Sequence, residues 1–383
     1  MTLTSDSPSK LFTKSKKIIS VHQKKPMDFE EKGNNFHQVK SLSLDVTRNI
    51  LFTFDYELYL GADSGTVKNC MIEPTEKIIN ILEKHGMKAI FFVDSTYLTQ
   101  LIRVSKDAPA ASRDLASIKM QLLSLLSAGH EVHPHIHPHW TDAEYNTEQN
   151  RWQLNDLKKY RFPSLNDEQK NKVFDESINA LHSLIKDAFP DYKMDAFRAG
   201  GWCIQPFSAF EPCFKKAGII ADFSVIGQLK ISSSVKSFDF SSVAPNAIPY
   251  RFSENECQPS EKGQYIELPI SSIPVSKNSR FNNLVEKIMW RMPFGKSMGD
   301  GKGVPYSNDL PVNLELQKFE TLSIEHLTFN KMPEYKKYLS SNAFMQFISH
   351  PKMVSSHHLK MLDKFLIWAT GKFQINSNWR QLR

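Results

Sequence analysis

A crowded run of histidines is the first feature of the sequence that could do chemistry. Residues 129–140, GHEVHPHIHPHW, hold five of the chain's 13 histidines together with Pro134 and Pro138. Neutral imidazole is a common ligand of zinc and related ions, so a short His-rich tract predicts a metal site. The prolines exclude a helix, because each lacks a backbone N–H and biases the preceding residue toward extended geometry. We therefore expect His135 and His139 to lie at a strand end and in the loop that follows it.

A third ligand is expected from the segment NILFTFDYELYLG, residues 49–61. Ile50 to Phe54 is rich in strand-forming residues and predicts a buried strand, with Asp55 and Glu57 at its end. Alternate residues of an extended chain point the same way, so Asp55 and Glu57 can face one site while Tyr56 faces away. Two neighbouring carboxylates repel each other unless a cation neutralises one of them, and the other is then free to act as a base.

Two further strand ends carry candidate residues. Arg198 lies in FRAGGW, where an arginine beside two glycines suits a bidentate clamp on a carboxylate, although an ordinary structural salt bridge is the alternative. The glycines let the backbone approach a ligand, and Trp202 could line that site. His350 lies in ISHP after a predicted strand, where barrel enzymes place their chemistry; a hydrogen-bonded structural histidine is the alternative.

The remainder of the sequence alternates strands with helices, which predicts an α/β fold with parallel strands. We expect strands at residues 50–55, 88–93, 131–135, 194–198, 220–225, 265–270 and 344–349, and helices at residues 74–85, 112–127, 167–189, 206–218 and 355–368. Residues 47–383 are predicted to form a single domain with insertions at about 141–165, 226–262 and 272–342. The aromatic side chains of the first insertion could stack on a sugar or pack the loop onto the body.

Composition and charge limit the choice of partner and compartment. The chain has 383 residues, 40% of them hydrophobic, and a formal net charge of +7. Much of the basic excess lies in residues 1–46, and no nucleic-acid-binding pattern is present, so we expect no nucleic-acid partner. We expect residues 1–46 to be a flexible polar tail, and we expect no transmembrane segment and a cytoplasmic location, which suits four cysteines without disulfide spacing.

The four motifs TFDYE, HIHPH, FRAGGW and ISHP, in this order, resemble those of the polysaccharide deacetylase superfamily (NodB homology, carbohydrate esterase family 4). The resemblance extends over roughly residues 48–370. It implies a distorted (β/α)7-type barrel with long loop insertions. It also implies a divalent metal held by Glu57, His135 and His139, with His137 outside the metal sphere. Zinc is the expected ion, with cobalt, nickel or iron as substitutes.

The resemblance also implies catalytic roles. Asp55 would be the base, oriented by Arg198, and His350 would be the acid, oriented by Asp222. Backbone N–H groups near Tyr56 or Gly200 would stabilise the oxyanion, and Trp202 would line the sugar site. The sequence has Asp-Tyr-Glu where two adjacent aspartates are usual, which indicates a divergent branch.

These observations predict a metal-dependent hydrolase that removes an N-acyl group, such as acetyl, from an amino sugar or polysaccharide precursor in surface polysaccharide synthesis. A nucleotide-linked or lipid-linked acetamido sugar is the expected substrate. Two alternatives stay open: a hydrolase of a non-sugar amide or cyclic imide, and an inactive carbohydrate-binding protein. The sequence does not specify an oligomeric state.

Overall fold

The computed structural model describes residues 46–61, 63–154, 158–233, 235–275, 292–303 and 318–382. The tail predicted for residues 1–46 lies outside the described residues except for its last position, and so do residues 276–291 and 304–317 of the third predicted insertion. Among the helices of the described residues, none is both long enough and apolar enough to cross a bilayer.

A curled sheet of parallel strands forms the body of the domain. In the order in which they pair, its parallel strands are β14 (Phe344–Ser349), β1 (Thr47–Tyr56), β2 (Ala89–Asp94), β3 (Glu131–Ile136), β6 (Ala196–Ala199), β7 (Ala221–Asp222) and β11 (Tyr265–Glu267). At the edges, β10 (Tyr250–Phe252) pairs antiparallel with β11, and β15 (Gln374–Asn376) pairs with the start of β1. The predicted α/β fold with a distorted barrel is confirmed.

The open edge of the sheet is bridged by the segment that follows β11. The Ser271 backbone N–H donates to the Gln346 carbonyl at 3.3 Å, and the Gln346 N–H donates to Ser271 Oγ at 3.0 Å. One of these two bonds uses a side chain, so the seam is not a regular backbone ladder. The barrel is therefore distorted at the junction between β14 and the chain beyond β11.

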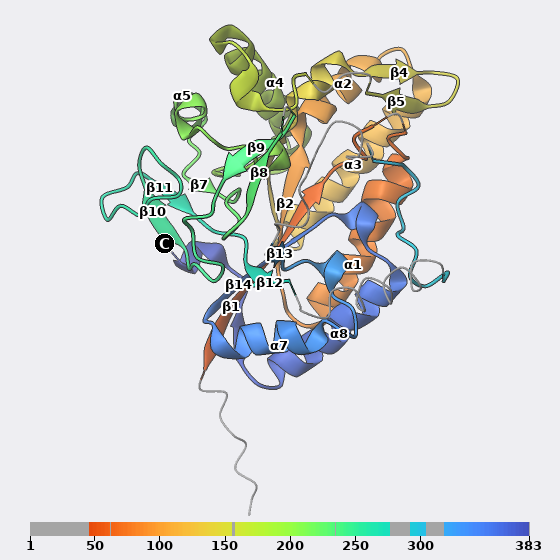
Figure 1. Cartoon of the computed structure of the whole chain (residues 1–383). Helices are drawn as coiled ribbons and strands as arrows, with labels where there is room; N and C mark the ends of the chain where they lie inside the picture. Colours follow the sequence, from red (N-terminus) through yellow and green to blue (C-terminus); the bar gives the residue numbers. More distant parts are fainter. Residues whose placement is uncertain are drawn as a thin grey trace, which may run out of the picture. The chain divides into compact units, whose positions relative to one another are not determined.

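Helices follow most of the parallel strands (Figure 1). The α-helices are α1 (Glu73–Lys84), α2 (Ser95–Val104), α3 (Pro109–Ser127), α4 (Asp167–Ile185), α5 (Glu211–Ala217), α7 (Met332–Ser341) and α8 (Ser356–Thr370). A capping box starts α4: the Gln169 N–H donates to Asn166 Oδ1 at 2.9 Å, and the Asn166 N–H donates to Gln169 Oε1 at 3.1 Å. Helix α2 was not predicted, because Asp94 ends β2 and caps the helix directly through the Tyr97 N–H, without an intervening loop.

The insertions carry short hairpins: β4 (Glu144–Asn146) with β5 (Arg151–Gln153), β8 (Lys230–Ser232) with β9 (Ser237–Asp239), and β12 (Ser272–Pro274) with β13 (Phe319–Thr321). The aromatic residues of the first insertion are largely buried. Trp152 is 3% exposed, Tyr160 4% and Phe162 3%. These three side chains therefore pack the loop onto the body.

The side chains of β1 that point into the barrel change from apolar to charged along the strand. Leu51 belongs to an apolar cluster that also contains Phe92 and Trp379. Two and four residues further along the chain are Thr53 and Asp55, both buried. Because side chains alternate along a strand, all three of these β1 residues share one face. The barrel thus has an apolar floor, with polar groups toward the carboxyl ends of the strands.

A pair of buried carboxyl groups lies between β7 and β11. Asp222 and Glu267 are register partners on these parallel strands, and both are fully buried. Burial raises the pKa of Asp222 to about 6. Burial, and then the charge of Asp222, raises the pKa of Glu267 well above its usual value. Two carboxyl groups in this position can share a hydrogen bond only if one of them keeps a proton.

The substitution Glu267→Gln should make stability less dependent on pH. A carboxyl whose pKa is raised by folding binds its proton more tightly in the folded chain, so the free energy of unfolding falls as pH rises above the unfolded pKa. We expect the wild type to lose up to about 1.4 kcal/mol per pH unit for this proton from about pH 5 upward, and Glu267→Gln to lose less. Urea unfolding at several pH values measures the slope. The exposed Glu254→Gln is the control, and equal slopes in wild type and Glu267→Gln would contradict the shared proton.

Candidate active site

Six side chains that could form a site come from strand ends that meet at one end of the barrel, and all of them except that of His137 were predicted as site residues from the sequence. Asp55 lies in β1 and Glu57 directly after it. His135 lies in β3 and His137 shortly after it. Arg198 lies in β6, and His350 follows β14. These side chains are buried except that of His350, which is 22% exposed. The carboxyl ends of the strands therefore form the site, as the fold predicts.

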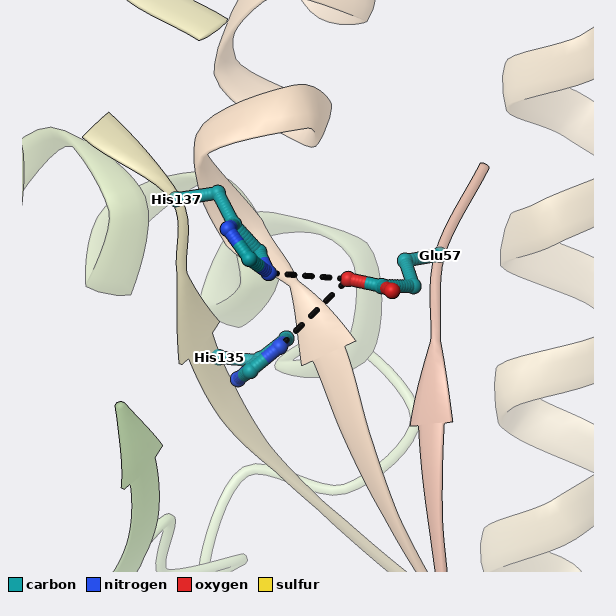
Figure 2. A group of neighbouring side chains, drawn as sticks. All are labelled: Glu57, His135 and His137. Carbon is teal, nitrogen blue, oxygen red and sulfur yellow. Dashed lines mark ion pairs between the residues drawn. The ribbon is translucent and has the colours of Figure 1, made fainter. Parts of the chain in front are cut away.

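Three of these residues form a group that could hold a metal ion: Glu57, His135 and His137 (Figure 2). One ligand atom from each lies within 4.8 Å of the others. Glu57 Oε2 is 2.9 Å from His137 Nε2 and 3.5 Å from His135 Nε2. Figure 2 shows both rings pointing toward the Glu57 carboxylate from the β3 side.

The tautomer of His135 is set by the neighbouring strand. His135 and Arg198 are register partners between β3 and β6, and His135 Nδ1 donates to the Arg198 carbonyl oxygen at 2.8 Å. In the neutral ring, Nε2 therefore carries a lone pair, and this nitrogen faces the carboxylates. An imidazole held in this way through its other nitrogen is the usual arrangement of a metal ligand.

Lys352 holds the other oxygen of Glu57. Its ammonium donates to Glu57 Oε1 at 2.8 Å and to the Leu58 carbonyl at 2.6 Å. Burial opposes the charge of Glu57, but Lys352 and then His137 outweigh it and lower the pKa of Glu57 well below its usual value. Glu57 is thus an oriented carboxylate whose Oε2 is directed at the two imidazoles.

The donor set fits a divalent ion. Glu57 Oε2, His135 Nε2 and both ring nitrogens of His139 are buried and lack a hydrogen-bond partner among the described residues. Burial lowers the pKa of His135, but Asp55 and Glu57 raise it to about 9. The two carboxylates therefore favour a positive charge at the position of this ring. Two imidazole nitrogens and a carboxylate oxygen are ligands that zinc and its neighbours accept.

The structure places His137, and not His139, beside Glu57 and His135. His137 is extended, with φ −114° and ψ 91°, so its side chain continues on the face of His135. The chain then enters a 3-10 turn at Pro138. This turn carries His139 onto the ring of Tyr160, with ring centroids 5.4 Å apart and planes 9° apart. Among the described residues, Glu57 and His135 are therefore grouped with His137, while the expectation that His139 is a metal ligand stays a prediction.

Asp55 is held across the barrel by Arg198. Arg198 Nη1 donates to Asp55 Oδ1 at 2.6 Å, Nη2 donates to Thr53 Oγ1 at 2.7 Å, and Nε donates to the Phe223 carbonyl at 2.9 Å. The guanidinium binds one carboxylate oxygen and is not a bidentate clamp. Burial opposes the charge of Asp55, but Arg198, followed by His135 and His350, lowers its pKa.

The histidine after β14 is oriented by Glu325. His350 Nδ1 lies 3.0 Å from Glu325 Oε1, and His350 Nε2 lies 3.6 Å from Asp55 Oδ2 and 3.8 Å from Glu57 Oε1. Burial lowers the pKa of His350, but Glu325 outweighs it and the pKa is raised.

The role predicted for Asp222 is corrected, because Glu325 occupies the position beside His350. Asp222 instead accepts a hydrogen bond from Ser224 Oγ at 2.7 Å and is paired with Glu267. Asp222 in β7 and Glu267 in β11 are thus part of the barrel wall.

The predicted substrate-binding residues differ in their positions. The Tyr56 side chain points away from the site and donates to Gln121 Oε1 at 2.7 Å, so only its backbone could contribute. Gly200 lies against the His137 ring, where an added Cβ would be 2.8 Å from Nδ1. Trp202 is partly exposed, and its indole Nε1 is buried without a hydrogen-bond partner among the described residues.

Comparison with known protein families gives a match to the part of the chain that runs from β1 to the end of β6. A model of the polysaccharide deacetylase family matches residues 47–199. This segment is a polysaccharide deacetylase domain. It contains five of the site residues: Asp55, Glu57, His135, His137 and Arg198. Glu325, His350 and Lys352 lie beyond the matched residues of the domain.

Several solved structures resemble the chain remotely. A protein assigned as a polysaccharide deacetylase from Mycobacterium smegmatis is 13% identical, with 87% of each chain covered and a TM-score of 0.45. A 4-alpha-glucanotransferase from Thermococcus litoralis is 13% identical over 86% of this chain and 39% of its own, with a TM-score of 0.42. A family 4 carbohydrate esterase from Streptomyces lividans in complex with acetate is 11% identical, covers 88% and 93%, and has a TM-score of 0.33. No curated protein matches the sequence.

Alanine substitutions should distinguish the two candidate histidines of the deacetylase domain. His137→Ala removes an atom that faces Glu57, so we expect zinc affinity to fall by more than the roughly 10–100-fold that loss of a ligand's hydrogen-bonding partner costs. His139→Ala removes a ring that stacks on Tyr160, so the affinity should stay within about tenfold of wild type. Isothermal titration of the metal-free chain with zinc measures both. The reverse order would restore His139 as the ligand.

Removing Lys352 should destabilise the metal-free protein. The substitution Lys352→Met leaves Glu57 buried without its cation, and breaking a buried pair from one side costs about 3–5 kcal/mol. Urea unfolding in the presence of a chelator should show this loss, and added zinc should recover part of it.

The exposed Lys360→Met on α8 is the matched control and should stay within about 0.5 kcal/mol of wild type. A loss in Lys352→Met that is no larger than in this control would show that Glu57 does not depend on Lys352.

Proposed function

We propose that the protein is a metal-dependent hydrolase that removes the acetyl group of an N-acetylated amino sugar. The observation that carries the proposal is the arrangement around Asp55. One of its oxygens is held by Arg198, and the other is 3.7 Å from His135 Nε2 and 3.6 Å from His350 Nε2. The family match of residues 47–199 supports a carbohydrate deacetylase.

Asp55 acts as the general base in this proposal. Arg198 keeps the carboxylate ionised and fixes Oδ1, so Oδ2 is the oxygen that can accept a proton from the attacking water. A divalent ion held by Glu57, His135 and His137 would supply Lewis-acid polarisation of the acyl carbonyl. The Phe223 carbonyl and Thr53 Oγ1 accept from Nε and Nη2, so Arg198 cannot move into the substrate space without breaking three hydrogen bonds.

His350 acts as the general acid. Glu325 accepts from Nδ1, which leaves Nε2 directed at the Asp55 and Glu57 carboxylates. The raised pKa favours the protonated ring, and a proton on Nε2 can pass to the departing amine. His350 is also more exposed than the other site residues, so the leaving group would depart on its side.

The two carboxylates have different tasks because they have different cations. Glu57 is paired with Lys352 and faces the imidazoles, which suits a ligand. Asp55 is paired with Arg198 and faces His350, which suits a base. We further propose that the sugar is a precursor or a chain of a surface polysaccharide, and that zinc, cobalt, nickel or iron fills the metal site.

Acetate release tests the proposal. The zinc-loaded chain should release acetate from N-acetylglucosamine oligomers or nucleotide-linked N-acetylglucosamine, and Asp55→Asn should lower kcat by about 10²–10⁴-fold, the usual contribution of a general base. Because Asp55 is not a proposed ligand, Asp55→Asn should still bind zinc. An enzyme-coupled acetate assay and elemental analysis give both quantities.

A matched non-sugar panel of N-acetylated amines and cyclic imides is assayed in parallel. Release from this panel alone would assign the chemistry to a different amide. No release from any N-acylated sugar with zinc bound would refute the deacetylase proposal.

A further inference from the structure

A buried lysine without an acidic partner lies beside the site. Lys236 is 8% exposed and lies in the turn between β8 and β9. Its ammonium is 3.9 Å from the centroid of the Trp202 ring and 5.6 Å from that of Phe238. Among the described residues, its ammonium has no hydrogen bond or ion pair. A buried charge is costly unless it is paired, and aromatic faces return only part of that cost.

Lys236 is connected to the site through Trp202, whose turn follows β6 directly. Burial lowers the pKa of Lys236 to about 8, and Asp55 and Glu57 are among the charges that act against this lowering. Neither carboxylate needs Lys236 as its counter-ion, because Asp55 is bound by Arg198 and Glu57 by Lys352. The positive charge of Lys236 is therefore not required by the carboxylates.

Trp202 offers a second donor at the same place. Its indole Nε1 is buried and has no hydrogen-bond partner among the described residues. The turn that carries it, Gly200–Trp202, follows β6 directly, and Gly200 contacts the ring of His137. The indole and the ammonium thus meet in the turn whose first residue contacts the proposed metal group, and among the described residues neither has an acceptor.

We propose that Lys236 and Trp202 bind an anionic group, a carboxylate or a phosphate, carried by the amino sugar whose acetyl group is hydrolysed. The inference rests on the proposed function and adds a substrate class to it: acidic or phosphorylated N-acetylated sugars. An anion satisfies both features at once, since it neutralises the ammonium and accepts from the indole N–H. A neutral hydroxyl could accept from the indole but would leave the charge uncompensated.

Binding measured without turnover tests the inference. Asp55→Asn, loaded with zinc, serves as the background, and isothermal titration compares N-acetylglucosamine with its 6-phosphate and with N-acetylglucosaminuronic acid. We expect at least one anionic sugar to bind about tenfold or more tightly than the neutral sugar, as a charge-assisted contact allows. The two anionic arms distinguish a phosphate from a carboxylate.

Two lysine variants in this background complete the experiment. Lys236→Met keeps the length of the side chain and should abolish the preference for the anionic sugar. Lys230→Met changes the same charge on the same hairpin, but Lys230 is exposed and pairs with Asp239, so the preference should persist.

Equal affinity of the neutral and anionic sugars in the background chain would overturn the inference while leaving the deacetylase proposal intact. The same holds if Lys236→Met keeps the preference, since the ammonium would then serve only to pack on Trp202. Binding of neither sugar class would overturn the inference, whereas acetate release by the wild type tests the deacetylase proposal separately. The background measurement needs no lysine variant, so a variant that fails to fold does not rescue the inference.

Discussion

The contact between Arg198 and Asp55 is the interaction on which the arrangement of the site depends. It joins β6 to β1 across the inside of the barrel, and both side chains are buried. Below it, the Arg198 guanidinium lies 4.3 Å from the centroid of the Phe92 ring, on the apolar floor. Further hydrogen bonds offset the cost of burying an ion pair, and Thr53 and the Phe223 carbonyl each accept one from Arg198. The ion pair lies between the apolar floor of the barrel and the polar residues of the site.

Charge balance organises the rest of the site. Each buried carboxylate has its own cation, Arg198 for Asp55 and Lys352 for Glu57, and each carboxylate also has one oxygen directed at imidazoles. Among the described residues, the carboxyl pair of β7 and β11 has no such cation, and the raised pKa of Glu267 favours a retained proton there instead.

Short-range sequence patterns predicted much of the fold and part of the site. Alternation along β1 predicted that Asp55 and Glu57 share a face, and the family resemblance predicted the contact of Arg198 with Asp55. The choice between His137 and His139 depended on the chain direction at Pro138, which the motif does not encode. Glu325 meets His350 over 25 residues of separation, and no spacing rule predicts such a contact.

The hydrogen bond from His135 to the Arg198 carbonyl has a consequence for how this site tolerates change. The acceptor is a main-chain atom, so every amino acid at position 198 supplies it as long as β3 and β6 stay in register. Arg198 therefore controls the charge of Asp55 through its guanidinium and the position of the proton on His135 through its carbonyl oxygen. A substitution at position 198 would remove the counter-ion of Asp55 but keep the orientation of the His135 ring. The ring is oriented by a main-chain carbonyl of the paired strand and not by a side chain.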